Sequence, residues 1–459
     1  MTRPLPVAVI GAGPVGLAAA AHLVSRGFSP LIFESGPSAG TALEAWGHVR
    51  VFSPWSYNID TVARALLEAE DWNVPNPKDI PLGREIVRRY LVPLAAHPSI
   101  APHVRYNAMV SAITRKGLDK MTTEGRSDAP FVVRWRDERG HEHSDLARAV
   151  IDASGTWRQP NPMGVDGLPI NGELAATSRI AYGIPDVLGG ARDIYAGHQV
   201  LVVGSGHSAI NIVLDLLRLQ DVEPSTRIIW GLRRNRIDRL LGGGLNDALP
   251  ARGALGLAAT QAIEAGRLEV LVPFAGERIS HDGAWLEVSG SINGTPWTGH
   301  VDRIVVATGF RPELSMLREL RIALDPAVEA PPSLAPLIDP NLHSCGTVPP
   351  HGAEQLAHPE PGFYIVGSKS YGRAPTFLMA TGYEQVRSVV AEIAGDHEAA
   401  RDVHLVLPET GVCSTASIVG SASTGCCGGP APQEADARCA ADDQAKDAGE
   451  KACGCGTAA

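Results

Sequence analysis

Apolar residues recur along the chain in short runs that predict buried strands alternating with helices. The first run, Val7–Ile10, has no polar position and is followed by an apolar stretch of helical character. Helices are also predicted over 60–70, 83–92 and 381–393, with Pro93 ending the second of these. Further strands are predicted at 30–34, 104–113, 131–135, 149–152, 198–203, 227–232, 268–273, 285–288, 303–307 and 362–367. This alternation predicts an α/β fold.

Glycines follow the first predicted strand at positions that favour a bound nucleotide. Gly11 and Gly13 permit a tight turn against a pyrophosphate, and Gly16 lets the next helix pack closely on the strand. The N-terminus of that helix favours an anion because its N–H groups are free. Glu34 ends the following strand, where a carboxylate can accept hydrogen bonds from a ribose diol. The alternative is a tight turn with no ligand.

A second unit of the same kind begins near residue 198. Gly204, Gly206 and Ser208 occupy its turn, and its next strand ends in Arg233 and Arg234, where the first unit ends in a carboxylate. A carboxylate repels a 2′-phosphate, whereas paired guanidiniums bind one through charge-assisted hydrogen bonds. The first unit is therefore predicted to take an unphosphorylated adenosine ribose and the second to prefer NADPH. A solvated basic patch is the alternative for the two arginines.

Two later strands each run into a small residue, a hydroxyl-bearing residue and a glycine. Residues 153–155 read Ala-Ser-Gly, and residues 307–309 read Ala-Thr-Gly. This repeat suits a chain that crosses between two nucleotide-binding domains beside a bound cofactor, although either tripeptide alone is compatible with an ordinary turn. Gly155 and Gly309 are therefore candidate cofactor-binding residues.

The composition and net charge of the chain limit the kinds of partner that it is expected to bind. The chain has 459 residues, which favours two or three domains, and a hydrophobic content of 44% that supports full burial of their cores. A formal net charge of −10 argues against a nucleic-acid or anionic-membrane surface, and no stretch resembles a membrane span. We therefore expect a small-molecule substrate, no nucleic-acid or membrane partner, and a cytoplasmic location.

Cysteines are concentrated near the C-terminal end of the chain. Six of the seven cysteines lie after residue 412, where small residues dominate and a flexible appendage is predicted. Five of these thiols are candidate ligands for a soft ion such as arsenite, antimonite, mercury or copper(I): Cys426, Cys427, Cys439, Cys453 and Cys455. The vicinal pair can instead serve as a redox relay, and an inert tail is the remaining alternative.

Together these motifs resemble the two-dinucleotide-binding-domain flavoproteins, and among them the flavin-containing and Baeyer–Villiger-type monooxygenases. The resemblance covers about residues 5–395. It implies two Rossmann-like three-layer domains, the first of them discontinuous. The implied segments are an FAD-binding domain at 1–185, an NADPH-binding domain at 190–325, a return to the FAD-binding domain at 326–405, and the cysteine-rich tail at 406–459.

The resemblance also assigns cofactors to the motif residues. It places FAD on the glycines and Glu34 of the first unit, and NADPH on the glycines, Ser208 and the arginines of the second. Gly367 occupies the position of a late glycine that touches the flavin, with Ser368 in place of the aspartate that usually follows it. The cysteine-rich tail resembles those of proteins linked to arsenic and heavy-metal handling.

Two features depart from the patterns of related flavoproteins. The phenylalanine–glycine–histidine fingerprint of the monooxygenases is replaced at 181–186 by Ala-Tyr-Gly-Ile-Pro-Asp, which lacks the histidine. The CxxxxC and CxxC motifs of disulfide reductases with the same fold are also absent from the predicted domains. Electrons that pass to thiols must therefore pass to the tail.

No residue stands out as catalytic. The loop after the strand 362–367 carries the candidates Lys369, Tyr371 and Arg373, of which the two cations are placed to stabilise negative charge near the flavin. Ser53 and Trp55 are further candidates, and packing or solvation accounts for these side chains equally well.

Three functions are compatible with these residues. The leading hypothesis is an FAD-dependent, NADPH-using oxidoreductase of monooxygenase type that acts on a small organic or metalloid substrate. The second is an NADPH-dependent reductase that passes electrons through the tail thiols to a metal, metalloid or disulfide. The third is a non-enzymatic, thiol-based metal-binding flavoprotein.

Overall fold

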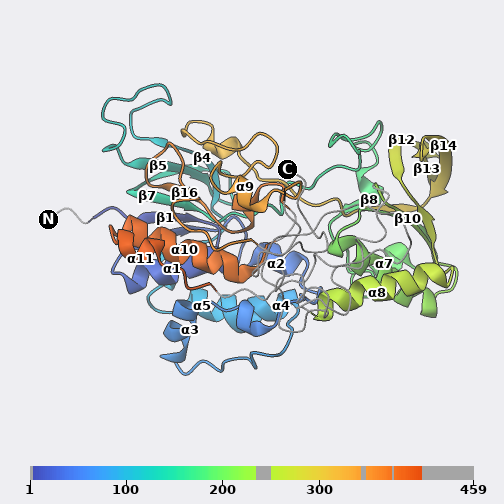
Figure 1. The fold of residues 1–459 in the computed structure, drawn as a ribbon, viewed down its shortest axis with the longest axis horizontal. Helices are drawn as coiled ribbons and strands as arrows, with labels where there is room; N and C mark the ends of the chain where they lie inside the picture. Colours follow the sequence, from blue (N-terminus) through green and yellow to red (C-terminus); the bar gives the residue numbers. More distant parts are fainter. Residues whose placement is uncertain (1–3, 234–249, 343–347, 375–376, 406–459) are drawn as a thin grey trace, which may run out of the picture. The chain divides into compact units, whose positions relative to one another are not determined.

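Two five-stranded parallel sheets organise the chain. The computed structural model describes residues 4–233, 250–342, 348–374 and 377–405, which belong to one compact unit. The first sheet has the order β16 (Phe363–Ile365), β7 (Ala149–Asp152), β1 (Val7–Ile10), β2 (Pro30–Phe33) and β3 (Val104–Arg105) (Figure 1). The second has the order β11 (Glu269–Leu271), β10 (Arg227–Gly231), β9 (Gln199–Val203), β15 (Arg303–Val306) and β8 (Ile180–Tyr182).

Each parallel sheet is the middle of three layers, because its strands are buried on both faces. In β1, Val7 and Val9 pack against the helices α1 (Pro14–Ser25) and α10 (Met379–Ile393). Ala8 and Ile10 pack on the opposite face against an antiparallel sheet. The absence of polar residues from this strand follows from its two apolar faces.

The outer layers repeat between the two halves. The antiparallel sheet of the first half contains β4 (Met109–Arg115), β5 (Phe131–Arg136) and β6 (Glu142–Ala147). In the second half, α7 (His207–Val222) and α8 (Pro250–Glu264) cover one face of the parallel sheet. The other face carries β12 (Phe274–Asp282), β13 (Trp285–Ile292) and β14 (Thr295–Val301).

Short helical segments connect these layers. They are α2 (Thr41–Ala45), η1 (Trp55–Tyr57), α3 (Thr61–Glu68), α4 (Gly83–Ile86), η2 (Val87–Leu91), α5 (Val92–Ala96), η3 (Ala101–His103), η4 (Thr177–Arg179), α6 (Arg192–Tyr195), η7 (Ser315–Leu317), α9 (Ala335–Ile338), η8 (Gly367–Tyr371) and α11 (His397–Arg401). The helix predicted over 60–70 is α3, and Asp60 caps it by accepting the Ala63 N–H at 2.8 Å.

These observations confirm the predicted α/β fold with two Rossmann-like, three-layer halves. The first half is discontinuous, because β16 returns to pair with β7 after the chain has completed the second sheet. β8 pairs with β15 in the second sheet, so the chain enters the second half before residue 185. The remaining domain boundaries stay predictions.

Pro93 does not end the helix predicted over 83–92. The chain continues from α4 through the π-helical segment η2 into α5, with Pro93 inside the first turn of α5. Proline has no N–H to donate to the carbonyl of Arg89. The Trp72 indole N–H donates to that carbonyl instead, at 2.8 Å. A partner distant in sequence therefore replaces the missing backbone donor.

The single strand predicted over 104–113 is two strands in different sheets. β3 pairs with β2 in the parallel sheet, whereas β4 pairs with β5 in the antiparallel sheet. Asn107 lies between them with a φ of 51°, in the left-handed region that asparagine tolerates better than most residues. The backbone turns there and takes the chain from one layer to the next.

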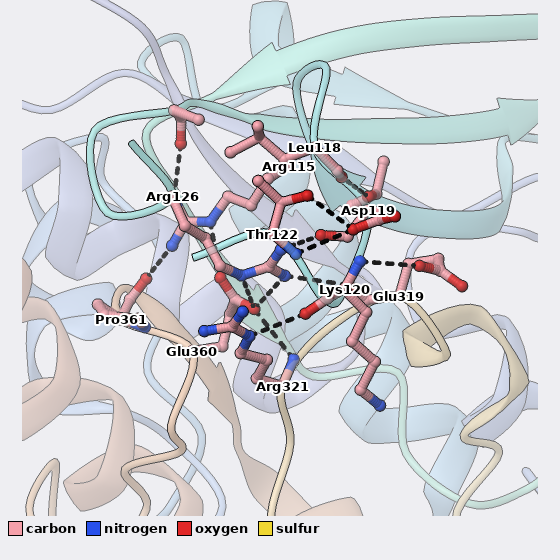
Figure 2. A network of polar contacts seen from close by, with 12 residues as sticks. Arg115, Leu118, Asp119, Lys120, Thr122, Arg126, Glu319, Arg321, Glu360 and Pro361 are labelled. Carbon is pink, nitrogen blue, oxygen red and sulfur yellow. Dashed lines mark hydrogen bonds and ion pairs between the residues drawn. The ribbon is translucent and has the colours of Figure 1, made fainter. Parts of the chain in front are cut away.

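A buried carboxylate, Glu360, joins three segments of the first half (Figure 2). Arg115 Nε donates to its Oε1 at 2.7 Å, and Arg126 Nη2 donates to its Oε2 at 2.6 Å. The backbone N–H of Arg321 donates to Oε2 at 3.0 Å. The side chains of Arg115, Arg126 and Glu360 are at most 4% exposed. Arg126 Nε also donates to Oε2, at 3.1 Å, and backbone carbonyls accept from Nη1 and Nη2 of both arginines, so the buried charges are well satisfied.

The network changes the titration of Glu360. Burial raises the pKa of this carboxyl, but hydrogen bonds from Arg126, the Arg321 N–H and Arg115 outweigh burial and hold the pKa below its ordinary value. A carboxyl with a depressed pKa in the folded state contributes stability above its unfolded pKa. That contribution is lost as the pH falls through the folded pKa.

We predict that Glu360→Gln lowers the free energy of unfolding by about 3–5 kcal/mol at pH 7, because two buried guanidiniums lose their counter-charge. Urea unfolding measures the loss, and the difference from the wild type is expected to shrink below about pH 4. Glu319→Gln is the control, because Glu319 is exposed on a neighbouring segment and is expected to change stability by less than about 0.5 kcal/mol. Equal stability of the two variants would contradict the role given to Glu360.

Candidate functional site

The predicted nucleotide-binding residues of the first half lie at one edge of its parallel sheet. Gly11 follows β1, Glu34 follows β2, Gly155 lies shortly after β7, and Gly367 lies just after β16. Because all these strands are parallel, their carboxyl ends meet at this edge. Open α/β sheets bind ligands outside the carboxyl ends of their strands. We call this edge the first crevice.

The glycines of the first turn have two different roles. A Cβ atom on Gly16 would lie 2.0 Å from the Gly11 carbonyl oxygen, so Gly16 permits the close packing of α1 on β1. A Cβ atom on Gly13 would have no heavy atom within 4 Å. No contact inside the protein therefore requires glycine at position 13, and the open space above it suits a ligand that approaches the backbone.

The Glu34 carboxylate accepts hydrogen bonds from the first turn and can accept one more from a ligand. Its side chain accepts the Ala12 N–H and the Gly36 N–H, each at 2.8 Å, and the Ser35 hydroxyl at 3.3 Å. An ionised carboxylate has about four acceptor positions. One position is therefore left for a ribose hydroxyl on a residue that is only 8% exposed.

The second turn repeats this division of roles. A Cβ atom on Gly204 would lie 2.3 Å from the Ala307 carbonyl oxygen, whereas a Cβ atom on Gly206 would have no neighbour within 4 Å. Ser208 lies in the first turn of α7, whose N-terminus this open turn precedes. Arg233 Nη1 donates to the Gly164 carbonyl at 3.3 Å. Arg234 lies outside the described residues.

Residues 159–161, which follow the first predicted crossing at 153–155, lie beside the second predicted crossing at 307–309. The backbone of Asn161 donates to the Gly309 carbonyl at 2.8 Å, and Arg311 donates back to the Gln159 carbonyl at 2.8 Å. The Thr308 hydroxyl donates to the Asn161 carbonyl at 2.8 Å. These bonds join 159–161 to 308–311 as a short antiparallel ribbon. Both chain passages between the sheets therefore follow one path.

Lys369 is buried at the sheet edge that we call the first crevice. Its Nζ donates to Asp152 Oδ2 at 2.7 Å and to the Ser154 hydroxyl at 3.1 Å, and neither ionic side chain has exposed surface. Asp152 is the last residue of β7, so the pair joins the ends of β7 and β16. The partner of Lys369 was not predicted. A carboxylate that ends an otherwise apolar strand was the available signal for it.

Gly367 is held by a buried polar chain from α10. Its N–H donates to Gln385 Oε1 at 2.7 Å, and Gln385 Nε2 lies 2.9 Å from both Ser370 Oγ and His351 Nε2. Burial lowers the pKa of His351, so the imidazole is neutral at pH 7 and its Nε2 accepts from Gln385. The Gly367 N–H is thus committed within the protein, and a ligand would meet the Cα of this residue.

The other catalytic candidates do not gather with Lys369. Tyr371 is buried between the rings of His351 and Phe377, and burial raises its pKa. Arg373 is exposed. Ser53 and Trp55 are buried and packed, with the Ser53 hydroxyl on Asn58 Oδ1 at 2.9 Å and Trp55 in the main core of the first half. Their catalytic roles stay predictions.

The predicted metal ligands Cys426, Cys427, Cys439, Cys453 and Cys455 lie outside the described residues. Within the described part of the chain, no group of three or more His, Cys, Asp or Glu side chains is arranged to hold a metal ion. No helix of that part is long and apolar enough to cross a membrane.

Sequence comparison supports the first nucleotide unit. Residues 9–73 match the family model of the NAD(P)-binding Rossmann-like domain. The chain is 28% identical over 213 residues to the indole-3-pyruvate monooxygenase YUCCA1 of Oryza sativa subsp. japonica. That match covers 46% of this chain and 44% of the relative, so it spans less than half of either protein.

Solved structures share the fold over most of this chain. Bacillithiol disulfide reductase Bdr (YpdA) from Bacillus cereus has a TM-score of 0.60 at 19% identity, covering 86% of this chain and 99% of its own. The cadaverine monooxygenase DfoA of Erwinia amylovora, solved with FAD, has a TM-score of 0.60 at 13% identity, covering 89% and 98%. Ornithine hydroxylase (PvdA) from Pseudomonas aeruginosa has a TM-score of 0.54 at 14% identity, covering 85% and 100%. At these identities the likeness shows the fold alone.

We predict that alanine destabilises the protein strongly at position 16 and only slightly or not at all at position 13. Gly16→Ala forces a Cβ atom against the Gly11 carbonyl and is expected to lower the free energy of unfolding by more than about 2 kcal/mol. Gly13→Ala meets no neighbour and is expected to change it by less than about 1 kcal/mol. Urea unfolding of the ligand-free protein measures both values. A large loss of stability in Gly13→Ala would contradict this prediction, because it would mean that contacts within the protein require glycine at position 13.

Proposed function

We propose that this protein is an FAD-dependent, NADPH-using oxidoreductase of monooxygenase type. FAD would occupy the first crevice, and NADPH would bind at the second turn. The substrate would be a small organic or metalloid compound. The chemistry that the flavin supplies when bound is acceptance of a hydride from NADPH and transfer of electrons to oxygen or another acceptor.

The contrast between two otherwise equivalent turns carries this proposal. Each turn has one glycine required by packing and one glycine that faces open space. A buried carboxylate, Glu34, follows the first turn, whereas the guanidinium of Arg233 follows the second. A carboxylate accepts from a free ribose diol and repels a phosphate, and a guanidinium binds a 2′-phosphate. Two different dinucleotides are the simplest ligands for such a pair of turns.

The residues of the chain would bind and orient the cofactors rather than perform covalent chemistry. Glu34 would hold the adenosine ribose of FAD, and the α1 N-terminus would hold its pyrophosphate. Gly206 and the α7 N-terminus would hold the pyrophosphate of NADPH, with Arg233 at its 2′-phosphate. The ribbon of 159–161 and 308–311 would keep the two turns at a defined separation.

The monooxygenase reaction is favoured over disulfide reduction by two further observations. The sequence contains no CxxxxC or CxxC motif in its predicted domains, so those domains offer no dithiol to receive electrons from a flavin. The curated relative, at 28% identity, is named as a monooxygenase. Oxygen is therefore the acceptor that we propose.

Anaerobic reduction followed by exposure to oxygen tests the proposal. Protein loaded with FAD is expected to lose its flavin absorbance on addition of NADPH and to regain it with oxygen. Oxygen uptake is expected to rise with one member of a panel of thiols, amines and organoarsenicals. Absence of flavin reduction by NADPH would overturn the proposed cofactor pair, and reduction without substrate-stimulated uptake would overturn the monooxygenase reaction.

We predict that Arg233→Gln raises the KM for NADPH about tenfold or more while changing the KM for NADH less than about twofold, because only NADPH carries the 2′-phosphate. Steady-state oxidation of the two nucleotides measures the change. Arg227→Gln is the matched control, because Arg227 is an exposed arginine at the start of the same strand. An equal rise in the KM for both nucleotides would mean that Arg233 does not recognise the 2′-phosphate.

The cysteines of the tail support a second candidate function, binding of a thiophilic ion or transfer of electrons to one. If the tail only binds the ion, deletion of residues 413–459 is expected to abolish stoichiometric arsenite binding and to leave the rate of NADPH oxidation unchanged. Loss of NADPH oxidation on deletion would favour the reductase over the monooxygenase. Retained arsenite binding would exclude the tail as the metal site. Equilibrium dialysis measures arsenite binding, and the decrease in NADPH absorbance measures NADPH oxidation.

A further inference from the structure

Ser154 connects the buried charge of Lys369 to the first crevice. Lys369 and Asp152 form an ion pair without exposed side-chain surface, and both contact Ser154, which is exposed. Ser154 lies just after the end of β7, at the carboxyl edge of the sheet. It is therefore the member of this group that a ligand in the crevice can reach.

The hydrogen bonds of Ser154 determine what its hydroxyl can offer. The hydroxyl donates to Asp152 Oδ1 at 2.6 Å and accepts from Lys369 Nζ at 3.1 Å. Its backbone N–H also donates to Asp152 Oδ1, at 3.1 Å, which fixes the turn. A serine hydroxyl has one donor and two acceptor positions. With the donor and one acceptor used, a single acceptor lone pair is left for the crevice.

The remaining lone pair of the Ser154 hydroxyl determines which kind of ligand group can bind to it. A phosphate or carbonyl oxygen needs a donor, and the Ser154 hydroxyl has no proton left to donate. A ligand hydroxyl has a proton to donate and would pair with the remaining lone pair. Ser154 is therefore built to receive a hydroxyl donor, such as a polyol chain, and not a phosphate.

The order of strands indicates which part of a dinucleotide reaches Ser154. Across the crevice, Glu34 follows β2, the glycine turn follows β1, Ser154 follows β7 and Lys369 follows β16. Since an adenosine ribose suits Glu34 and a pyrophosphate suits the turn, the next group along the ligand would lie at β7. In FAD that group is the ribityl chain, which carries hydroxyls.

We propose that Ser154 accepts a hydrogen bond from a ribityl hydroxyl of FAD, and that Lys369 is a positioning residue that orients Ser154 for this bond. The inference rests on the proposed binding of FAD to the first crevice. Lys369 does not touch the ligand, because it has no exposed surface and its ammonium is directed to Asp152 and Ser154. Its charge balances Asp152 and its proton fills one lone pair of Ser154.

Comparison of FAD with ADP separates the ribityl contact from the rest of the site. For Ser154→Ala, we expect the Kd of FAD to rise about tenfold, the effect of one lost hydrogen bond, and the Kd of ADP to change less than about twofold. Fluorescence titration of the ligand-free protein with FAD, and competition by ADP, give the two values. Ser56→Ala, an exposed serine elsewhere in the first half, is the matched control. An unchanged Kd for FAD, or an equal rise for ADP, would overturn the contact.

A pair of variants tests the role of Lys369. Lys369→Met leaves Asp152 buried without a counter-charge and is expected to lower the Tm by more than about 5 °C and to weaken FAD binding. The double variant Asp152→Asn with Lys369→Met removes both charges and is expected to regain most of the Tm, while the Kd of FAD stays about tenfold above the wild type. If the double variant regains both the Tm and the FAD Kd of the wild type, the positioning role is overturned and Lys369 acts only as a counter-ion to Asp152. A wild-type protein that binds neither FAD nor ADP would instead overturn the proposed function.

Discussion

Two buried groups of paired charges, one on each side of β16, hold the return of the chain to the first sheet. Glu360 lies just before this short strand and binds Arg115 and Arg126, and Lys369 lies just after it and binds Asp152. Charges buried in this way are stable only when every one is paired, so a shifted strand would leave several of them unpaired. The ion pairs thus specify the register of β16 beside β7, and with it the position of the Gly367 turn at the crevice.

The two halves of the molecule reach a similar arrangement with different local chemistry. In each half, helices cover one face of a parallel sheet and a three-stranded antiparallel sheet covers the other. Both nucleotide turns lie at carboxyl strand ends, and the antiparallel ribbon of 159–161 and 308–311 joins the two passages of the chain. The packing is shared because fully apolar strands need two covered faces on the parallel sheet. The residues after the second strand of each half differ, and we propose that they bind different nucleotides.

Local motifs could be predicted from the sequence, and contacts between distant segments could not. The glycine turns and Glu34 lie where the spacing predicted, since a strand, a turn and a helix form from neighbouring residues. Pro93 was expected to end a helix, but Trp72 supplies the donor that the proline lacks. The strands β6, β12 and β14 were not predicted, since their exposed polar positions carry little apolar signal and their partners complete them.

By itself the sequence determined the alternation of strands and helices, the two dinucleotide turns and the opposite charges that follow them. These features depend on residues within one strand–turn–helix unit, where backbone geometry and side-chain chemistry act at short range. Only the tertiary structure decided the surroundings of Lys369, which the sequence left equally open to a place near the flavin and to solvation. Its partner Asp152 is 217 positions away in the chain, and burial of the pair leaves Ser154 as the group at the crevice. The physical reason is that pairing and burial of a charge depend on which segments the fold brings together.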